Sequence, residues 1–416
     1  MSNTILATPL TLPSGVVLQN RLVKGAMAEQ FADANNNPSD PHILAYREWS
    51  TGGWGGLLTG NVDVSTKYMG GYNDVALSAS PNTATIESWH RWVAEVQAHN
   101  TPGIVQLVHA GRQSWPGAKR SFFEKSIAPS PTPLVTGPGI LERLMSKMLW
   151  GTPREMTIPE IKEAVQQFAR AAKFVHEAGF KGIELHGAHG YLITQFLSSK
   201  INFRTDEYGG TPAKRARFLI EVIRAIRAVV PATFAVGVKF NSADVGGQES
   251  LEENLEQLGL VVAEQVDFIE ISGGTYENMR MGGPEKPKAE RTIEREAFFL
   301  DYASIVRERF PKVILMVTGG FRTRRGMIAA LESGACDIVG VGRPATVWPH
   351  LVKDIILNDE VGDDDANVVL PPIHPPWLVR QLGIKMINNS ADTMHHVVNI
   401  GLMGEGKKPI HPSEKA

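Results

Sequence analysis

The chain has 416 residues, of which 43% are hydrophobic and 21% are charged, and its formal net charge is −2. This balance is typical of a globular protein and lacks a basic bias, so we expect no nucleic-acid partner. The single cysteine, Cys336, excludes a disulfide framework and a cysteine-ligated zinc or iron–sulfur site, and its apolar neighbours predict burial. No apolar run reaches the ~18 residues of a membrane span and no signal peptide is recognisable, so we expect a cytoplasmic protein without a membrane partner.

Short apolar segments alternate with segments of helical periodicity, which is typical of parallel strands joined by crossover helices. Eight such segments fit a closed barrel of roughly 250 residues plus insertions. An open doubly wound sheet would need phosphate-binding glycines after its first strand, and none lie there. We therefore predict an α/β fold, an eight-stranded parallel β/α (TIM-type) barrel, with residues 1–416 as one domain. The predicted strands are 21–26, 56–62, 104–108, 182–185, 234–239, 267–271, 313–317 and 337–341.

Other local signals complete this outline. Residues 10–18 are expected to form an N-terminal hairpin around Ser14 and Gly15 that closes the bottom of the barrel. Hydroxyl and glutamate side chains at capping-box spacing predict helix starts, and glycines after helical segments predict helix ends. These signals are Thr157 with Glu160, Ser250 with Glu253, and the glycines Gly179, Gly259 and Gly334.

Two segments extend beyond the repeating units. Residues 116–151, after the third strand, are rich in proline and glycine but include an amphipathic stretch at 141–150. Because an insertion there would lie over the catalytic face of a barrel, we interpret it as a lid; the alternative is a mobile linker. Residues 357–416 form a C-terminal extension that could pack on its own barrel or on a neighbouring subunit, so a homodimer is possible.

The most informative motif follows the fourth strand, where the carboxyl end of a barrel strand carries chemistry. His186 and His189 can both hydrogen-bond one electronegative atom of a ligand, and the phenol of Tyr191 can give a proton to a nearby carbon. The alternative is that the two histidines bind a metal ion or are structural, although a metal site would need a third ligand.

Two glycine-rich loops follow the last two strands, where many barrels bind phosphate. Gly319 and Gly320 lie in the first loop, and Gly342 and Arg343 lie in the second. Glycines let backbone amides approach an anion, and an arginine can hold two of its oxygens. The alternative is that these glycines only turn the chain.

Two polar residues point to a ring lying between these sites. Lys239, at the end of the fifth strand, is either solvated at the rim or held beside an electron-rich ring. Gln106, on the third strand, can donate to and accept from a uracil-like edge. With the phosphate loops they outline a phosphorylated heteroaromatic cofactor, and FMN fits this outline.

From Pro9 to Trp348 the chain resembles the old yellow enzyme family of FMN-dependent ene-reductases. Several motifs in order carry the resemblance: Asn20–Met27, Gln106–Arg112, the His-x-x-His-Gly-Tyr-Leu stretch, Asn202–Gly210 with Arg215 and Arg217, Gly319–Gly320, and Gly342–Pro344. The resemblance implies a non-covalent FMN that is reduced by NADPH or NADH and reoxidised by a small-molecule substrate, an α,β-unsaturated carbonyl or nitro compound. Hydride would go to the β-carbon and a proton to the α-carbon. We interpret Asn202–Gly210 and Arg215 as structural.

The resemblance also implies site roles. Around the flavin ring it places Ala26, Met27, Ala28, Gly60 and Gln106, with Lys239 near N1 and O2, and at the phosphate it places Gly319, Gly320, Gly342 and Arg343. His186 and His189 would bind the substrate oxygen, and Tyr191 would be the acid. Two departures stand out: Ala28 replaces the usual threonine or cysteine that bonds flavin O4, and Lys239 replaces the common arginine. The alternatives are a flavin barrel that oxidises its substrate and a catalytically idle flavin- or phosphate-binding barrel.

Overall fold

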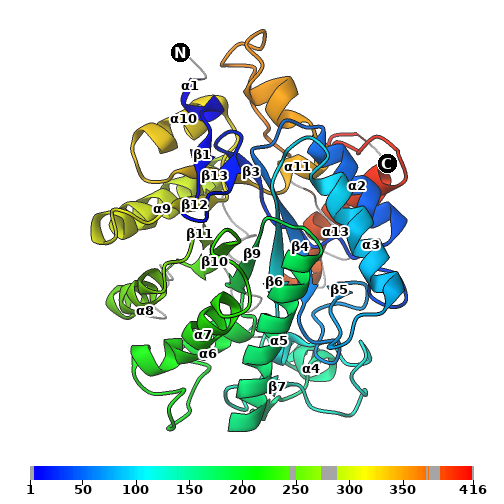
Figure 1. Cartoon of the computed structure of the whole chain (residues 1–416), viewed down its shortest axis with the longest axis vertical. Coiled ribbons are helices and arrows are strands. Elements are labelled where there is room, and N and C mark those ends of the chain that lie inside the picture. The colour runs from blue at the N-terminus through cyan, green and yellow to red at the C-terminus, as the bar shows by residue number, and fades with distance from the viewer. Residues whose placement is uncertain are drawn as a thin grey trace.

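Eight parallel strands close into a barrel in the computed structural model, which describes residues 4–137, 139–242, 250–272, 288–371, 373 and 385–414 (Figure 1). Each strand pairs with its neighbours in parallel, and β13 pairs with β3 to complete the circle. Every strand overlaps one predicted segment, so the predicted barrel is confirmed. In order around the barrel the strands are β3 (Leu22–Lys24), β4 (Gly56–Asp63), β6 (Gly103–Val108), β9 (Gly182–Gly187), β10 (Ala235–Asn241), β11 (Phe268–Ser272), β12 (Leu315–Thr318) and β13 (Ile338–Val341), with β5 (Val75–Ala76) added beside β4.

Helices surround the barrel and begin where the capping residues predict. The Thr157 hydroxyl accepts from the backbone N–H of Glu160 at the start of the helix that begins at Ile158. The Ser250 hydroxyl accepts in the same way from Glu253, at the start of the helix that begins at Leu251. The stop predicted at Gly259 is wrong, because α8 continues to Ala263; a Cβ at Gly259 would lie 3.2 Å from the ring of Phe310, so close packing explains this glycine. The helices are α1 (Thr4–Ala7), α2 (Asp40–Ser50), α3 (Thr83–Val96), α5 (Ile158–Glu177), α6 (Leu192–Leu197), α7 (Pro212–Arg227), α8 (Leu251–Ala263), α9 (Lys288–Arg309), α10 (Arg324–Glu332), α11 (Pro344–Val347) and a π-turn η3 (Val352–Ile356).

The N-terminal end of the barrel is filled by apolar side chains. Strands β1 (Leu10–Thr11) and β2 (Val17–Leu18) pair antiparallel, and Leu12 and Leu18 pack with inward residues of the barrel strands, including Leu58 and Phe268. Burial of this layer leaves only the opposite, carboxyl end of the strands for polar chemistry.

The insertion after β6 has structure of its own. It follows the 3₁₀ turn η1 (Gly111–Gln113) and contains α4 (Ile140–Leu149) and β7 (Ile127–Ala128). Strand β7 pairs in parallel with β8 (Arg154–Glu155), which lies just after the insertion. Arg112 donates to the carbonyls of Thr132 and Pro133. Arg204, from the motif interpreted as structural, donates to Pro129 and Met156. Buried arginines therefore attach the insertion to the barrel.

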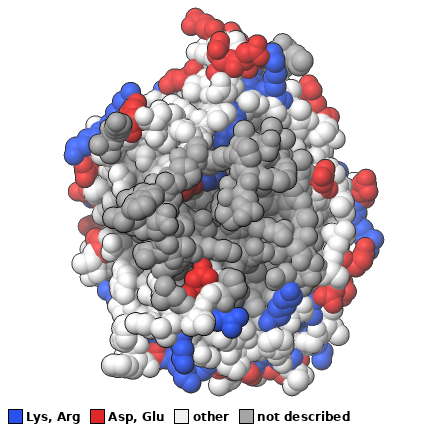
Figure 2. All heavy atoms as spheres, turned by 180° about the vertical axis from the view of Figure 1, so that it is seen from behind, with Lys and Arg blue, Asp and Glu red and all other residues white. Residues whose placement is uncertain are grey.

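The described part of the C-terminal extension packs on its own barrel. Helix α13 (Lys385–Gly404) lies against α2 and α11, and His396 hydrogen-bonds Thr346 at 2.6 Å. Residues 374–384 of the extension lie outside the described residues. None of the helices that the structure describes is long and apolar enough to span a bilayer. On the described part of the face in Figure 2, acidic and basic side chains lie mostly around the margin, and several acidic side chains lie together at the top.

Candidate active site

His186, His189 and Tyr191 form one buried group at the carboxyl end of β9. His186 is the penultimate residue of the strand, and its ring lies 5.0 Å from that of His189 and 4.6 Å from that of Tyr191, centroid to centroid. His189 has φ 57°, an uncommon backbone conformation for a non-glycine residue, and this turn brings its Nδ1 to 3.3 Å from Nε2 of His186. The structure therefore brings together the three residues that the motif singled out.

Both histidines are neutral, and a backbone amide defines the tautomer of His186. Burial lowers the pKa of His186 well below its usual value and that of His189 to about 3, with the nearby Lys239 charge adding to the effect. The backbone N–H of Ala188 donates to Nδ1 of His186 at 3.3 Å, so the His186 proton is on Nε2, facing His189. His189 Nε2 lies 3.1 Å from the hydroxyl of Ser272, at the end of β11. The pair can thus offer hydrogen-bond donors without carrying charge.

Two contacts of this group were not predicted from the sequence. The side-chain amide of Asn61, on β4, donates to the Tyr191 hydroxyl at 3.0 Å, and Ser272 holds the far side of His189. A signal existed for Ser272, because it ends a predicted strand as His186 does. Among the described residues, no three His, Cys, Asp or Glu side chains are grouped so that they could hold a metal ion.

Lys239 lies inside the barrel in an ion pair. Its ammonium is 2.6 Å from a carboxylate oxygen of Glu270 on the neighbouring strand β11, and the two side chains are 4% and 0% exposed. The alternative of a solvated lysine at the rim is therefore wrong. Burial alone would lower the pKa of Lys239, but the charge of Glu270 and its hydrogen bond to the ammonium raise it above its usual value, so the ammonium stays charged.

A second carboxyl group lies beside this pair. Glu184 accepts a hydrogen bond from the side-chain amide of Gln106 at 2.6 Å, and its other oxygen, Oε2, is buried next to Glu270. Oε2 of Glu184 has no donor among the described residues, whereas the Thr318 hydroxyl lies close enough to Glu270 to lower the pKa of that carboxyl. Two carboxylate oxygens, one from Glu184 and one from Glu270, can form a hydrogen bond only if one of them carries a proton. Burial, together with the charge of Glu270, raises the pKa of Glu184 well above its usual value. We therefore assign one proton to Glu184, and the cluster Gln106–Glu184–Glu270–Lys239 is neutral overall.

Glycines after β12 and β13 form an open cradle at the same end of the barrel. Gly319 and Gly320, directly after β12, have φ of 132° and 87°, which only glycine adopts readily. A Cβ on Gly342 would lie 3.4 Å from the sulfur of Met27, so the loops after the first and last strands meet here. A Cβ on Gly319 would lie 3.2 Å from the ring of Phe299, so these glycines also make room for neighbouring side chains. Glycine backbone at this end of the barrel suits a phosphorylated ring that approaches closely.

Arg343, expected at the phosphate, has a protein partner. Its Nη1 lies 2.5 Å from a carboxylate oxygen of Asp392 on α13, and the two side chains are about one-fifth and one-quarter exposed. An arginine has five donors in a planar fork, so this pair occupies only part of its capacity. The contact makes the C-terminal extension part of the wall of the predicted phosphate site.

Gly60 has a structural reason to be glycine. A Cβ there would lie 2.0 Å from the Glu29 carboxylate and 2.2 Å from the carbonyl oxygen of Met27. Its backbone N–H donates to Glu29 at 2.7 Å, so this amide is already engaged. Ala26, Met27 and Ala28 are half-buried in the adjoining loop, where a ring could lie on them.

A β/α barrel with a glycine cradle, an interior lysine and amide, and neutral histidine donors at one mouth defines the class of flavin-dependent barrel oxidoreductases. A family model described as the NADH:flavin oxidoreductase / NADH oxidase family matches residues 6–358, and the chain belongs to this family. It is an NAD(P)H-dependent FMN oxidoreductase of the old yellow enzyme family, as the sequence resemblance predicted.

Known relatives cover nearly the whole chain. It is 44% identical over 398 residues to the NADH-dependent flavin oxidoreductase iliE of Hypocrea jecorina (strain QM6a), covering 95% of this chain and 99% of that protein. It is 32% identical over 417 residues to the NADH-dependent flavin oxidoreductase nadA of Aspergillus parasiticus, covering 95% and 90%. The fold is similar to that of the old yellow enzyme homologue from Zymomonas mobilis, with a TM-score of 0.68, 22% identity and coverage of 86% and 94%.

Proposed function

We propose that this enzyme reduces the carbon–carbon double bond of α,β-unsaturated carbonyl or nitro compounds. The observation that carries the proposal is the pairing of His186 and His189, whose facing nitrogens lie 3.3 Å apart at hydrogen-bond distance, next to the phenol of Tyr191. Two donors and an acid in this order match what an enone needs: its oxygen must be held while its α-carbon receives a proton.

The histidine pair binds the activating oxygen of the substrate. His186 already carries its proton on Nε2, so it donates directly. His189 donates from Nδ1 when its own proton is there, and its Nε2 then accepts from the Ser272 hydroxyl instead of donating to it. A hydroxyl can take either role, so Ser272 lets His189 change tautomer without losing its hydrogen bond. Both rings are neutral, His186 is buried and His189 is partly buried, so their donors act where water weakens them little.

Tyr191 gives the proton to the α-carbon. As the proton leaves, negative charge grows on the phenolic oxygen, which already accepts a hydrogen bond from Asn61 at 3.0 Å. A donor to the charged form favours that form, so Asn61 assists the transfer. Asn61 touches the acid and not the substrate, and we assign it as a positioning residue.

FMN, when bound, supplies the chemistry of accepting hydride from NADPH or NADH and passing it to the β-carbon. The residues that would hold it are the loop at Ala26, Met27 and Ala28, with Gly60 beneath, the amide of Gln106, and Lys239; the phosphate would lie at Gly319, Gly320, Gly342 and Arg343. The glycine cradle and the half-buried loop fit this assignment. Lys239 brings positive charge, and Glu270 holds its ammonium in place.

Anaerobic turnover with 2-cyclohexenone tests the proposal. The FMN-loaded enzyme should consume one NADH or NADPH for each saturated ketone that gas chromatography detects, and Tyr191→Phe should lose most of this turnover. Formation of the allylic alcohol would contradict it, and so would the absence of any product from the enone when a parallel aerobic assay shows that the enzyme still passes electrons from NADH or NADPH to oxygen.

A further inference from the structure

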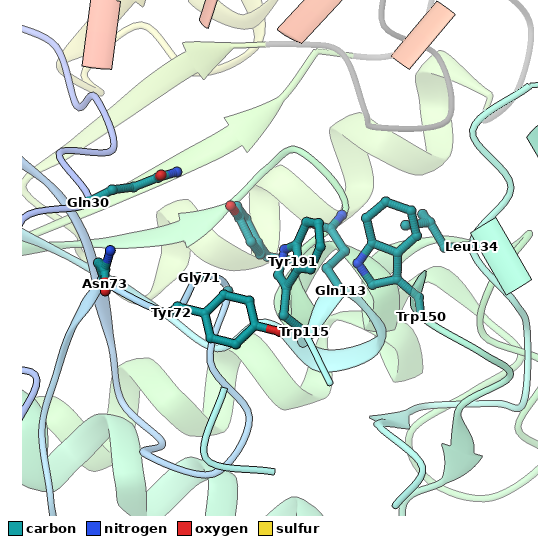
Figure 3. A pocket seen from close by; sticks show the side chains of 10 residues that line it. Gln30, Gly71, Tyr72, Asn73, Gln113, Trp115, Leu134, Trp150 and Tyr191 are labelled. Carbon is teal, nitrogen blue, oxygen red and sulfur yellow. The ribbon is translucent and has the colours of Figure 1, made fainter. Parts of the chain in front are cut away.

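An aromatic cavity of about 310 Å³ opens beside Tyr191 (Figure 3). Three rings line it together with Tyr191: Tyr72, from the segment between β4 and β5, and Trp115 and Trp150, from the two ends of the insertion. Because Tyr191 belongs both to this wall and to the histidine group, the cavity borders the site where the substrate oxygen would bind.

The rings are held in defined positions. The centroids of Trp115 and Trp150 are 5.4 Å apart in an edge-to-face arrangement, and Tyr72 lies 6.3 Å from Trp115. The Tyr72 hydroxyl donates to the carbonyl of Pro116 at 2.6 Å, which attaches this ring to the insertion. Rings at these distances and angles can pack against one more planar group without rearrangement.

The wall carries no ionisable group except the phenols. Among the described residues that line the cavity, no Lys, Arg, His, Asp or Glu occurs, and its polar side chains are the neutral amides Gln30, Asn73 and Gln113. Moving an ionised group from water into such a site without a partner is costly, whereas neutral oxygen atoms can bond to the amides. The cavity therefore discriminates against carboxylates, phosphates and ammonium groups.

We propose that this cavity is the subsite for the β-substituent of the substrate, and that the preferred substrate is an uncharged enone whose β-carbon carries an aromatic or fused-ring group. The inference rests on the proposed ene-reduction, because Tyr191 connects the two sites. Size supports it: an apolar cavity of ~150 Å³ is enough for benzene, and this cavity has about twice that volume, which suits two fused rings.

The test compares methyl enones that carry a methyl, phenyl or naphthyl group on the β-carbon, using the FMN-loaded enzyme. The wild type should show kcat/KM rising along this series, by roughly tenfold or more from methyl to naphthyl. Trp115→Ala should remove most of this gain, so that the ratio of kcat/KM between the naphthyl and methyl compounds falls close to one. Phe123→Ala is the matched control, because Phe123 lies on the same insertion but is 93% exposed and does not line the cavity.

A charge swap and a binding measurement keep the result interpretable if Trp115→Ala folds poorly. The wild type should reject a naphthyl enone that bears a ring carboxylate and accept its methyl ester. Asn73→Lys, a substitution at the exposed rim, should raise kcat/KM for the carboxylate. Separately, 2-naphthol should perturb the flavin absorbance at lower concentration than phenol does, without any turnover.

The outcomes separate the two proposals. If no enone is reduced but 2-naphthol still binds more tightly than phenol and loses this advantage in Trp115→Ala, the subsite stands and ene-reduction fails. If the methyl enone is reduced but the naphthyl compound gains nothing, or Trp115→Ala and Phe123→Ala behave alike, ene-reduction stands and the subsite is refuted.

Discussion

The two glutamates inside the barrel should respond differently to the same substitution. Glu184→Gln replaces a protonated carboxyl with an amide of the same shape, whose oxygen still accepts from Gln106 and whose N–H₂ can donate to Glu270. Because the charge is unchanged and only one hydrogen bond is altered, the free energy of unfolding should fall by about 1 kcal/mol or less. Adding Glu270→Gln leaves the ammonium of Lys239, which is 4% exposed, without a carboxylate. Removing one partner of a buried ion pair costs about 3–5 kcal/mol.

The double variant is needed because Glu184 can substitute for Glu270. In Glu270→Gln alone, Glu184 can lose its proton and become the counter-ion of Lys239. The loss in free energy of unfolding should therefore lie between the losses in Glu184→Gln and in the double variant. Urea unfolding of the FMN-loaded chain at neutral pH measures the three free energies from midpoint and slope. The midpoint potential of the bound flavin is a second readout: it should rise in the double variant, which has lost negative charge, and stay unchanged in Glu184→Gln.

Equal destabilisation by Glu184→Gln and Glu270→Gln, with equal shifts of the flavin potential, would refute this reasoning. It would mean that the two carboxyl groups carry the same charge, and that the proton assigned to Glu184 is not there.

Tyr191→Phe should slow enone reduction by roughly 10²–10⁴ and leave flavin reduction by NAD(P)H unchanged, because only the second half-reaction puts a proton on carbon; equal slowing of both in stopped-flow would remove Tyr191 from the acid role. Replacing both His186 and His189 with alanine should weaken phenol binding by about 2–5 kcal/mol at normal FMN content, and loss of a bound metal instead would favour the metal-pair alternative. Burial lowers the pKa of His109 from 6.5 to about 4, so between these pH values the unfolded chain binds a proton that the folded chain does not, and stability falls as the pH falls. His109→Gln should reduce the slope of unfolding free energy against pH by about 1.4 kcal/mol per unit in this window, and an unchanged slope would show that His109 titrates normally. Ala28→Thr should raise the flavin midpoint by roughly 20 mV through a donor to O4, and an unchanged or lower value in a dye-equilibration titration would show that residue 28 does not face O4.

The features that could be predicted from the sequence are those encoded by neighbouring residues. The eight strands and the capped helix starts follow from local periodicity and from hydroxyl–glutamate spacing. His186, His189 and Tyr191 were found because they follow one another at a strand end, so a single element places all three. The wrong prediction at Gly259 has the same origin. The glycine was interpreted as a helix end from its local sequence alone, whereas a glycine is needed there because the ring of Phe310, a residue distant in the chain, packs against it.

The features that were missed join residues far apart in the chain. Asn61 contacts Tyr191 across 130 residues, and Lys239 pairs with Glu270 across 31. Spacing carries no information on such pairs, which depend on how neighbouring strands align. A partial signal was present, since Glu184 lies two residues before His186 and Glu270 two before Ser272, so alternation places each on the inward side of its strand. Their shared proton depends on burial and could only be assigned from the structure.

An anaerobic redox titration tests the central claim most directly. The purified yellow enzyme should lose its flavin absorbance with one equivalent of NADH or NADPH, and one equivalent of 2-cyclohexenone should restore it as the saturated ketone forms. A flavin that bleaches but is not reoxidised by any enone or nitroalkene, or one that NADH and NADPH both fail to reduce, would contradict the proposed reaction.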